Sequence, residues 1–320
     1  MTADTVLLVT ASYDIAADYV CKSLQTKGIP SFRLNTDHFP SQIKASFHPL
    51  NDIEFIEEIN EKKVLGTSIK SVWYRRHVSP ELPEGLEPGV RNFCERETRA
   101  FLDGVIASLP TERIMSSPQA ILRAEHKPYQ LSIASQLGFT IPDTIMTNNP
   151  SLVREIAHRH NLVAKAISSG YIVGINGNQA IFTSVVRPKD LEDLNGLTLA
   201  PVTFQEFIQK VSDIRVTVVA GEVFAAEILS QERESSRTDW RATDDPHLVH
   251  RIHELPVEIE NLCRKLTTNL GLSFGAIDLV LKPDGSYIFL EINPNGEWVW
   301  LEDQLGFPIS DRIARWLSIN

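Results

Sequence analysis

The stretch G-A-I-D-L-V-L-K-P-D-G-S-Y-I-F-L-E-I-N-P-N-G, residues 275–296, contains two apolar runs separated by a turn. Pro-Asp-Gly at 283–285 favours a tight reversal, because proline fixes one backbone angle and glycine permits the unusual ones. The two runs therefore predict a β-hairpin. Glu291 and Asn293 are two residues apart on the returning strand, so their side chains point to the same face.

Pairing across this turn predicts a metal site. Asp278 lies on the first strand, and the hairpin can bring its carboxylate beside Glu291 and Asn293. Three oxygen-bearing side chains that converge in this way suit Mg²⁺ when its other ligands are phosphate oxygens and water. The alternative is an amphipathic hairpin whose acids face water. Against that alternative, both carboxylates interrupt apolar runs, where an unpaired charge is costly.

Length and composition indicate a globular protein of several parts. The 320 residues favour two or three subdomains, and 42% hydrophobic and 22% charged residues are ordinary values. The net charge of −10 argues against nucleic-acid partners, which need clustered Lys and Arg. No apolar run is long enough for a membrane span and no signal peptide is recognisable, so we expect a cytoplasmic protein without a membrane partner.

The three cysteines give little sign of chemistry. Cys21, Cys94 and Cys263 are scattered and lack metal-binding spacing, which predicts reduced thiols. A catalytic role for one of them stays an alternative.

Residues 1–118 predict a small α/β domain that opens with a β-α-β unit. No GxGxxG motif follows the first strand, so a dinucleotide site is not expected. Arg75, Arg76 and His77 follow a predicted strand, a place where α/β proteins often contact ligands, but a solvated basic cluster is the favoured interpretation. The strands expected here are 5–10, 31–34, 69–74 and 114–115, and the helices are 14–27 and 91–109.

A lysine near a strand end predicts a phosphate clamp further along the chain. Strand 162–166 carries Lys165 and precedes the small-residue loop 168–174 and a hairpin at 175–183, turned at 176–178. The ammonium group can neutralise phosphate oxygens while backbone N–H groups of the loop close over them. The alternative is an edge lysine that prevents aggregation.

Strand 212–219 carries a second charged pair on one face. Arg215 can hold a transferring phosphoryl group, and Asp213 can either accept a hydrogen bond from a ribose hydroxyl or orient Arg215. The alternative is a charge pair on a solvated face. The polar segment 231–245, which contains Trp240, is predicted to be an irregular functional loop.

In their order and spacing these features resemble the ATP-grasp superfamily over about residues 119–320. The resemblance implies an α/β (α+β) ATP-grasp fold: an amino-terminal domain at 1–118, a central subdomain at 119–200, and a carboxyl-terminal subdomain at 201–320 with antiparallel sheets and the metal site. Mg²⁺ and ATP are the implied cofactors. The implied metal ligands are Asp278, Glu291 and Asn293, the implied ATP-binding residues are Lys127, Lys165, Gln205, Glu206, Phe207, Ile208 and Asp213, and the implied catalytic residues are Lys165, Arg215 and Arg241.

Residues 291–302 are most similar to the microviridin-type ligases, which macrocyclise ribosomally made peptides (graspetides). Asp239-Trp240-Arg241 agrees with that branch. The alternative is a glutamate-type ligase, which adds a free amino acid to a protein tail or small molecule. Such ligases typically have Asn-x-Ser-Pro-Gly where this chain has Asn-Pro-Asn-Gly, and this difference favours the microviridin-type branch. A nucleotide-binding protein without ligase activity is a third class, but it predicts damage to the lysines or metal ligands, and none is visible.

The resemblance implies two chemical stages and a peptide partner. A carboxylate of a ribosomal precursor peptide takes the γ-phosphoryl group of ATP, and a hydroxyl or amine of the same peptide then closes an ω-ester or ω-amide ring. We expect a leader segment of that peptide to dock on the protein. Arg187–Leu199 is a candidate docking edge, with a solvated surface helix as the favoured alternative. A homodimer is compatible with the resemblance.

Overall fold

The computed structural model describes residues 4–49, 52–168, 170–174, 177–242 and 248–318. The chain forms two compact units: unit 1 is Met1–Pro118 with Glu297–Asn320, and unit 2 is Gln119–Gly296. The expected mixed α/β class is confirmed. One difference concerns residues 297–320, which were expected in the carboxyl-terminal subdomain and instead pack with residues 1–118.

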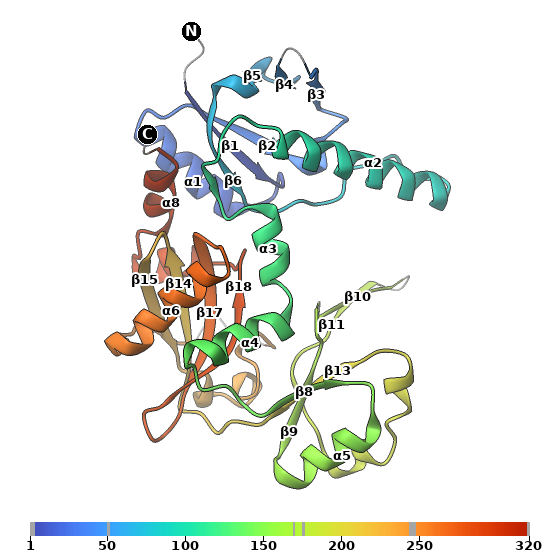
Figure 1. The fold of residues 1–320 in the computed structure, drawn as a ribbon, viewed down its shortest axis with the longest axis vertical. Coiled ribbons are helices and arrows are strands. Elements are labelled where there is room, and N and C mark those ends of the chain that lie inside the picture. Colours follow the sequence, from blue (N-terminus) through green and yellow to red (C-terminus); the bar gives the residue numbers. More distant parts are fainter. Residues whose placement is uncertain (1–3, 50–51, 169, 175–176, 243–247, 319–320) are drawn as a thin grey trace. The chain divides into compact units, whose positions relative to one another are not determined.

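A parallel sheet in the order β2-β1-β6-β7 forms the centre of unit 1 (Figure 1). Strand β1 is buried at every position, as expected for a parallel strand covered on both faces. Helix α1 begins after Asp14, whose side chain accepts a hydrogen bond from the Ala16 N–H. The elements of this layer are β1 (Thr5–Thr10), α1 (Ile15–Thr26), β2 (Ser31–Asn35), β6 (Ile69–Tyr74), α2 (Pro88–Ala107) and β7 (Ile114–Met115).

Three further strands in unit 1 were not anticipated. Strands β3 (Ile43–Phe47), β4 (Ile53–Glu57) and β5 (Lys62–Leu65) form an antiparallel sheet in that order. Each has only four or five residues and is partly exposed, so its apolar pattern is too short to stand out from the flanking loops.

The returning carboxyl-terminal segment packs on α1 and β6 of unit 1, and its first residue, the exposed Glu297, pairs with a buried arginine. Arg75, at the end of β6, is 1% exposed, and its Nη2 lies 2.9 Å from Glu297 Oε1. Its Nε lies 3.4 Å from Asp14 Oδ2. The interpretation of residues 75–77 as a solvated cluster is therefore wrong for Arg75. Two helices follow Glu297: α7 (Val299–Leu305) and α8 (Ile309–Ser318).

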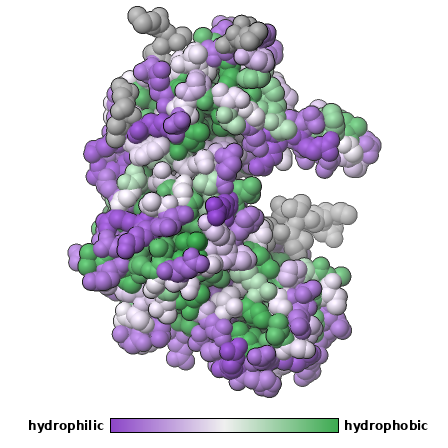
Figure 2. Space-filling view, viewed as in Figure 1, coloured by the Kyte–Doolittle hydropathy of each residue, from purple (hydrophilic) through white to green (hydrophobic). Residues whose placement is uncertain are grey.

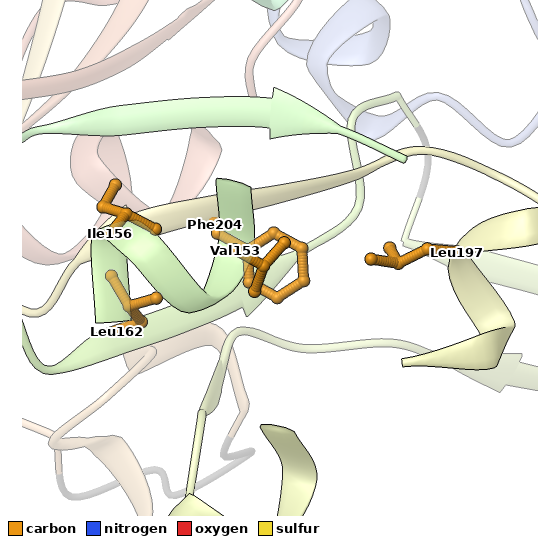
Figure 3. Packing of buried hydrophobic residues seen from close by; sticks show 5 residues of the cluster. All are labelled: Val153, Ile156, Leu162, Leu197 and Phe204. Atoms are coloured by element: carbon orange, nitrogen blue, oxygen red, sulfur yellow. The ribbon is translucent and has the colours of Figure 1, made fainter. Parts of the chain in front are cut away.

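Unit 2 contains a four-stranded sheet in the order β12-β9-β13-β8. Figure 3 shows the core beside it, where Val153 and Ile156 of α5 meet Leu162, Phe204 and Leu197. Because α5 presents Val153 and Ile156 three residues apart, both reach the same face of the sheet. The elements are β8 (Thr144–Thr147), α5 (Pro150–Arg159), β9 (Leu162–Lys165), β12 (Ser184–Val185) and β13 (Val202–Glu206).

A five-stranded antiparallel sheet in the order β16-β15-β14-β17-β18 carries the hairpin predicted from residues 275–296. Helix α6 (Val257–Asn269) covers one of its faces with Cys263 and Leu266, and α4 (Lys127–Leu137) lies next to β18 (Figure 1). Short α3 (Pro118–Ala124) precedes α4. The strands are β14 (Ser212–Val219), β15 (Glu222–Ile228), β16 (His250–Ile252), β17 (Phe274–Leu281) and β18 (Tyr287–Asn293).

Several predicted boundaries in unit 2 differ from the structure. Strand β13 ends at Glu206, so Phe207 and Ile208 follow the strand and do not belong to it. The hairpin consists of β10 (Tyr171–Gly174) and β11 (Gly177–Ala180), one strand earlier than predicted, and Asn176 of the predicted turn lies outside the described residues. Segment 231–245 is less irregular than expected, because its described part contains three 3₁₀ turns: η5 (Ser230–Glu232), η6 (Glu234–Ser236) and η7 (Trp240–Ala242).

The surface is of mixed polarity. On the face drawn in Figure 2, hydrophilic and hydrophobic residues are interspersed, and α2 carries mostly hydrophilic ones. Among the described helices, none combines the length and the apolar composition that crossing a lipid bilayer requires.

The packing of Phe204 predicts a stability difference. Phe204→Ala removes a ring that is 5% exposed and leaves a cavity, so we expect the free energy of unfolding to fall by about 3–5 kcal/mol in urea titrations followed by circular dichroism. Leu199→Ala is the control, because Leu199 is 90% exposed and its truncation opens no cavity. Equal effects of the two substitutions would contradict this account of the core.

Candidate active site

Three charged side chains form one row across neighbouring strands of unit 2. Arg215 on β14 is the register partner of Asp278 on β17, and Asp278 is the register partner of Glu291 on β18. Residues directly opposite one another in antiparallel strands place their side chains on the same face. The backbone register therefore brings together two predicted metal ligands and one predicted catalytic residue.

Asp278 is held by two neighbours on that face. Arg215 Nη1 donates to both carboxylate oxygens, at 2.8 and 3.0 Å, and Asn293 Nδ2 donates to Oδ2 at 3.1 Å. Gly296, which ends the Asn-Pro-Asn-Gly stretch, packs beneath the guanidinium group: a Cβ there would lie 2.8 Å from Arg215 Nη2 and 2.4 Å from Ala276 Cβ. Only glycine permits this close approach of backbone to Arg215.

Glu291 is buried among cations. Lys127 Nζ contacts Glu291 Oε2, and Arg241 Nη1 donates to Oε1 at 3.0 Å. Burial by itself would raise the pKa of Glu291, but the charges of Lys127, Arg241 and Lys165 outweigh it and hold that pKa well below its usual value. The carboxylate is therefore kept ionised and ready to bind a cation.

Asp239 orients Arg241 from the other side. Its Oδ1 accepts from Arg241 Nε at 3.0 Å, and its Oδ2 accepts from Arg241 Nη2 at 3.2 Å and from Thr183 Oγ1 at 3.1 Å. Burial tends to raise the pKa of Asp239, but the hydrogen bonds and charge of Arg241 lower it. This fork fixes the plane of the guanidinium group, so Nη1 points to Glu291.

Lys165 lies on the neighbouring four-stranded sheet. Its Nζ donates to Gln205 Oε1 at 2.9 Å, and Gln205 Nε2 donates to Thr144 Oγ1 at 2.8 Å. Burial lowers the pKa of Lys165, and the charge of Glu291 offsets this only in part. Anionic phosphate groups placed beside this lysine would favour its charged form.

A pocket with about 660 Å³ of empty space joins these residues to the segment after β13. Asp213 also reaches it, paired with Lys210 Nζ at 2.7 Å, and burial raises the pKa of Asp213 despite that partner. An adjoining pocket shares Lys165, Arg241 and Glu291 and adds Lys127, Ser168 and Gly170, whereas Ser169 lies outside the described residues. The predicted site residues that line the first pocket are Lys165, Gln205, Glu206, Phe207, Ile208, Asp213, Arg241, Asp278 and Glu291.

Sequence reasoning missed two contributors to this pocket. Lys210 was not among the predicted site residues, although its position three residues before Asp213 is a signal for pairing. Thr183 gave no sequence signal, because it binds Asp239 across 56 positions of the chain.

The donor set fits a hard divalent cation. Asp278 and Glu291 are 8% and 7% exposed, and directly paired residues in an antiparallel sheet have Cα atoms about 4.5–5.5 Å apart. The side-chain amide of Asn293 lies beside them and contacts Asp278 through its Nδ2. Oxygen-only donors with cations at their rim match Mg²⁺ that shares its coordination with phosphate groups. The assignment of individual ligands stays a prediction.

Family models match nearly the whole chain in two segments. Residues 5–121 match the MvdD pre-ATP grasp domain, and residues 125–317 match the RimK-like ATP-grasp domain. The chain therefore belongs to the ATP-grasp family with a RimK-like ATP-grasp domain, and the predicted resemblance to this superfamily is confirmed.

Solved structures confirm the similarity to the microviridin-type branch. The crystal structure of macrocyclase MdnC with precursor peptide MdnA from Microcystis aeruginosa MRC has a TM-score of 0.88 and 35% identity, covering 98% of this chain and 99% of that chain. A Chryseobacterium gregarium RiPP-associated ATP-grasp ligase, in complex with ADP and leader and core peptides, has a TM-score of 0.89 and 32% identity. The match covers 98% of this chain and 96% of that chain.

A curated relative matches over a shorter region. Beta-citrylglutamate synthase B of Danio rerio is 26% identical over 212 residues, which are 63% of this chain and 49% of that protein. The chain spans about half the length of the curated relatives it matches first.

The lowered pKa of Glu291 predicts a pH-dependent loss of stability. Glu291→Gln leaves Lys127 and Arg241 without their counter-charge, so we expect the free energy of unfolding near neutral pH to fall by about 3 kcal/mol. Because the folded-state pKa is below the unfolded value of about 4.3, the contribution of Glu291 is complete above that pH and declines below it.

Urea unfolding at neutral pH and at about pH 3.5 would measure this difference, which should narrow in acid. Glu258→Gln, a change at an exposed carboxylate of α6, is the control. If the difference in free energy of unfolding between wild type and Glu291→Gln became larger in acid, the pKa of Glu291 would not be lowered in the folded protein.

Proposed function

We propose that this chain is an ATP-dependent, ADP-forming ligase that closes ω-ester or ω-amide rings in a ribosomally made precursor peptide. The observation that carries the proposal is the row of Arg215, Asp278 and Glu291, whose two carboxylates line one pocket with Lys165 and Arg241. Phosphoryl transfer requires positioning and charge neutralisation more than covalent catalysis. The similarity to macrocyclase MdnC over nearly the full chain supports the peptide substrate.

ATP binds in the pocket after β13. Glu206, Phe207 and Ile208 contact the adenine, and Asp213 accepts from the ribose. Lys127 and Lys165 bind phosphate oxygens, as their shared position at the adjoining pocket allows. Asp278, Glu291 and Asn293 hold Mg²⁺, which neutralises charge on the phosphate groups when it is bound.

The first stage activates a side-chain carboxylate of the peptide. Its oxygen attacks the γ-phosphorus of ATP, the bond to the β-phosphate oxygen breaks, and ADP leaves an acyl phosphate on the peptide. Arg215 and Arg241 stabilise the negative charge that spreads over the transferring group. Ser168 and Gly170 line the adjoining pocket, where they help to exclude water that would hydrolyse the acyl phosphate.

The second stage forms the ring. A Ser or Thr hydroxyl, or a Lys amine, attacks the acyl carbon and gives up its proton, and the bond to phosphate breaks. The peptide thus loses one water for each ring. A carboxylate of the site or the released phosphate serves as the base.

The leader segment of the peptide docks on Arg187–Leu199. This segment forms two 3₁₀ turns, η3 (Pro188–Leu191) and η4 (Asn195–Thr198), and not the surface helix that was favoured. It offers the acidic side chains of Glu192 and Asp193 next to the exposed Leu199. We also place the reaction in the cytoplasm, where ATP is present and where free thiols such as those of this chain persist.

The reaction predicts a change in peptide mass. After incubation with ATP, Mg²⁺ and the precursor peptide encoded beside this chain, mass spectrometry should show a loss of about 18 Da for each ring formed. Asp278→Asn should abolish the loss, because it removes a carboxylate from the metal site. An unchanged peptide mass together with ADP release that depends on a free amino acid would refute the macrocyclase and support the amino-acid ligase.

The fork between Asp239 and Arg241 predicts a rate effect. Arg241→Lys keeps the charge but loses the two-point contact with Asp239, so we expect kcat to fall about 10²-fold in an ADP-release assay, with the fold retained. Arg237→Lys is the matched control, because Arg237 lies in the same loop and its Nε donates to the carbonyl of Gln231 and not to a carboxylate of the site. An Arg241→Lys enzyme of wild-type rate would remove Arg241 from the catalytic residues.

A further inference from the structure

Strand β18, which carries Glu291 and Asn293, is the edge of the five-stranded sheet. It is also irregular, because the register with β17 shifts between Asp278 and Leu279, so that Leu290 is an extra residue directly before Glu291. A bulge re-aims the next side chain and weakens the local ladder. The direction of Glu291 and Asn293 therefore needs support from outside the sheet.

That support comes from one side chain of α4. Gln130 Oε1 accepts from the backbone N–H of Ile292 at 3.1 Å, and Gln130 Nε2 donates to the carbonyl of Ile292 at 2.8 Å. The side-chain amide thus pairs with Ile292 as a neighbouring strand would. Gln130 is 3% exposed, and Nε2 also donates to the carbonyl of Ala124 at 2.6 Å, which fixes the amide from behind.

The same helix reaches the site by a second route. Lys127 is three residues before Gln130, so both side chains project from one face of α4, and Lys127 contacts Glu291. Just beyond α4, the carbonyl of Thr140 accepts from the N–H of Phe289 at 2.9 Å, on the other side of the bulge. The helix and its exit therefore replace the missing strand along the edge of β18.

We infer that Gln130 is a positioning residue for divalent-cation binding: through the backbone of Ile292 it sets the direction of Glu291 and Asn293. This inference rests on the proposed function, which makes these two side chains metal ligands. Groups that orient metal ligands typically contribute about 10- to 100-fold to metal affinity. The nucleotide pocket after β13 does not depend on Gln130 in this way. Substitution of Gln130 should therefore lower the affinity for the divalent cation and leave the affinity for ADP nearly unchanged.

The test measures Mn²⁺ binding by electron paramagnetic resonance in the presence of ADP, and ADP binding without metal by calorimetry. Gln130→Met keeps the size of the side chain and removes its hydrogen bonds. Gln130→Asn keeps the amide group on a side chain that is one methylene shorter, and it replaces the methionine variant in the test if that variant does not fold. Gln136→Met is the matched control, since Gln136 is exposed on the same helix and bonds only to Ser132 among the described residues.

We expect the Gln130 variants to bind Mn²⁺ about 10- to 100-fold more weakly, with ADP affinity changed by less than about two-fold and Gln136→Met unchanged. In turnover, the apparent KM for Mg²⁺ should rise while kcat at saturating Mg²⁺ stays close to wild type. A folded Gln130 variant with wild-type Mn²⁺ affinity, or a parallel loss of Mn²⁺ and ADP binding, would overturn the positioning role. Wild-type protein that binds ADP but no Mn²⁺ would instead overturn the metal site itself.

Discussion

Two buried carboxylates, each paired with cationic side chains from other elements, lie at the centre of the site in unit 2. Asp278 and Glu291 are paired across β17 and β18, where solvent cannot stabilise their charge. Each is therefore met by a cation: Arg215 from the next strand for Asp278, and Lys127 and Arg241 from α4 and the loop after β15 for Glu291. Elements far apart in the chain converge because these charges have to be balanced in one place.

This balance links the fold to phosphoryl transfer. Cations that neutralise the carboxylates are the groups that phosphate oxygens require, so a site built to keep Glu291 ionised is already suited to Mg²⁺ and ATP. The requirement also explains local features without obvious chemistry. Gly296 leaves room for Arg215, and Asp239 restricts the orientation of Arg241.

Much of the architecture could be predicted, and the failures have physical reasons. Continuous apolar runs such as Val6–Val9 and the hairpin around Pro283 gave their strands directly, because burial and turn chemistry are local properties. Strands β3 to β5 were missed because they are short and half exposed. The place of residues 297–320 in unit 1 depends on α7 and α8 packing against α1 and β6, elements that lie more than two hundred positions earlier in the chain.

The sequence by itself determined the family, the hairpin, and which residue types gather for metal and phosphate, since spacing on a strand fixes which side chains share a face. Only the tertiary structure decided which distant residues pair: Thr183 with Asp239, and Gln130 with the backbone of Ile292. These contacts join separate elements, and a one-dimensional pattern cannot specify them, because their geometry arises when a helix and a bulged edge strand pack together.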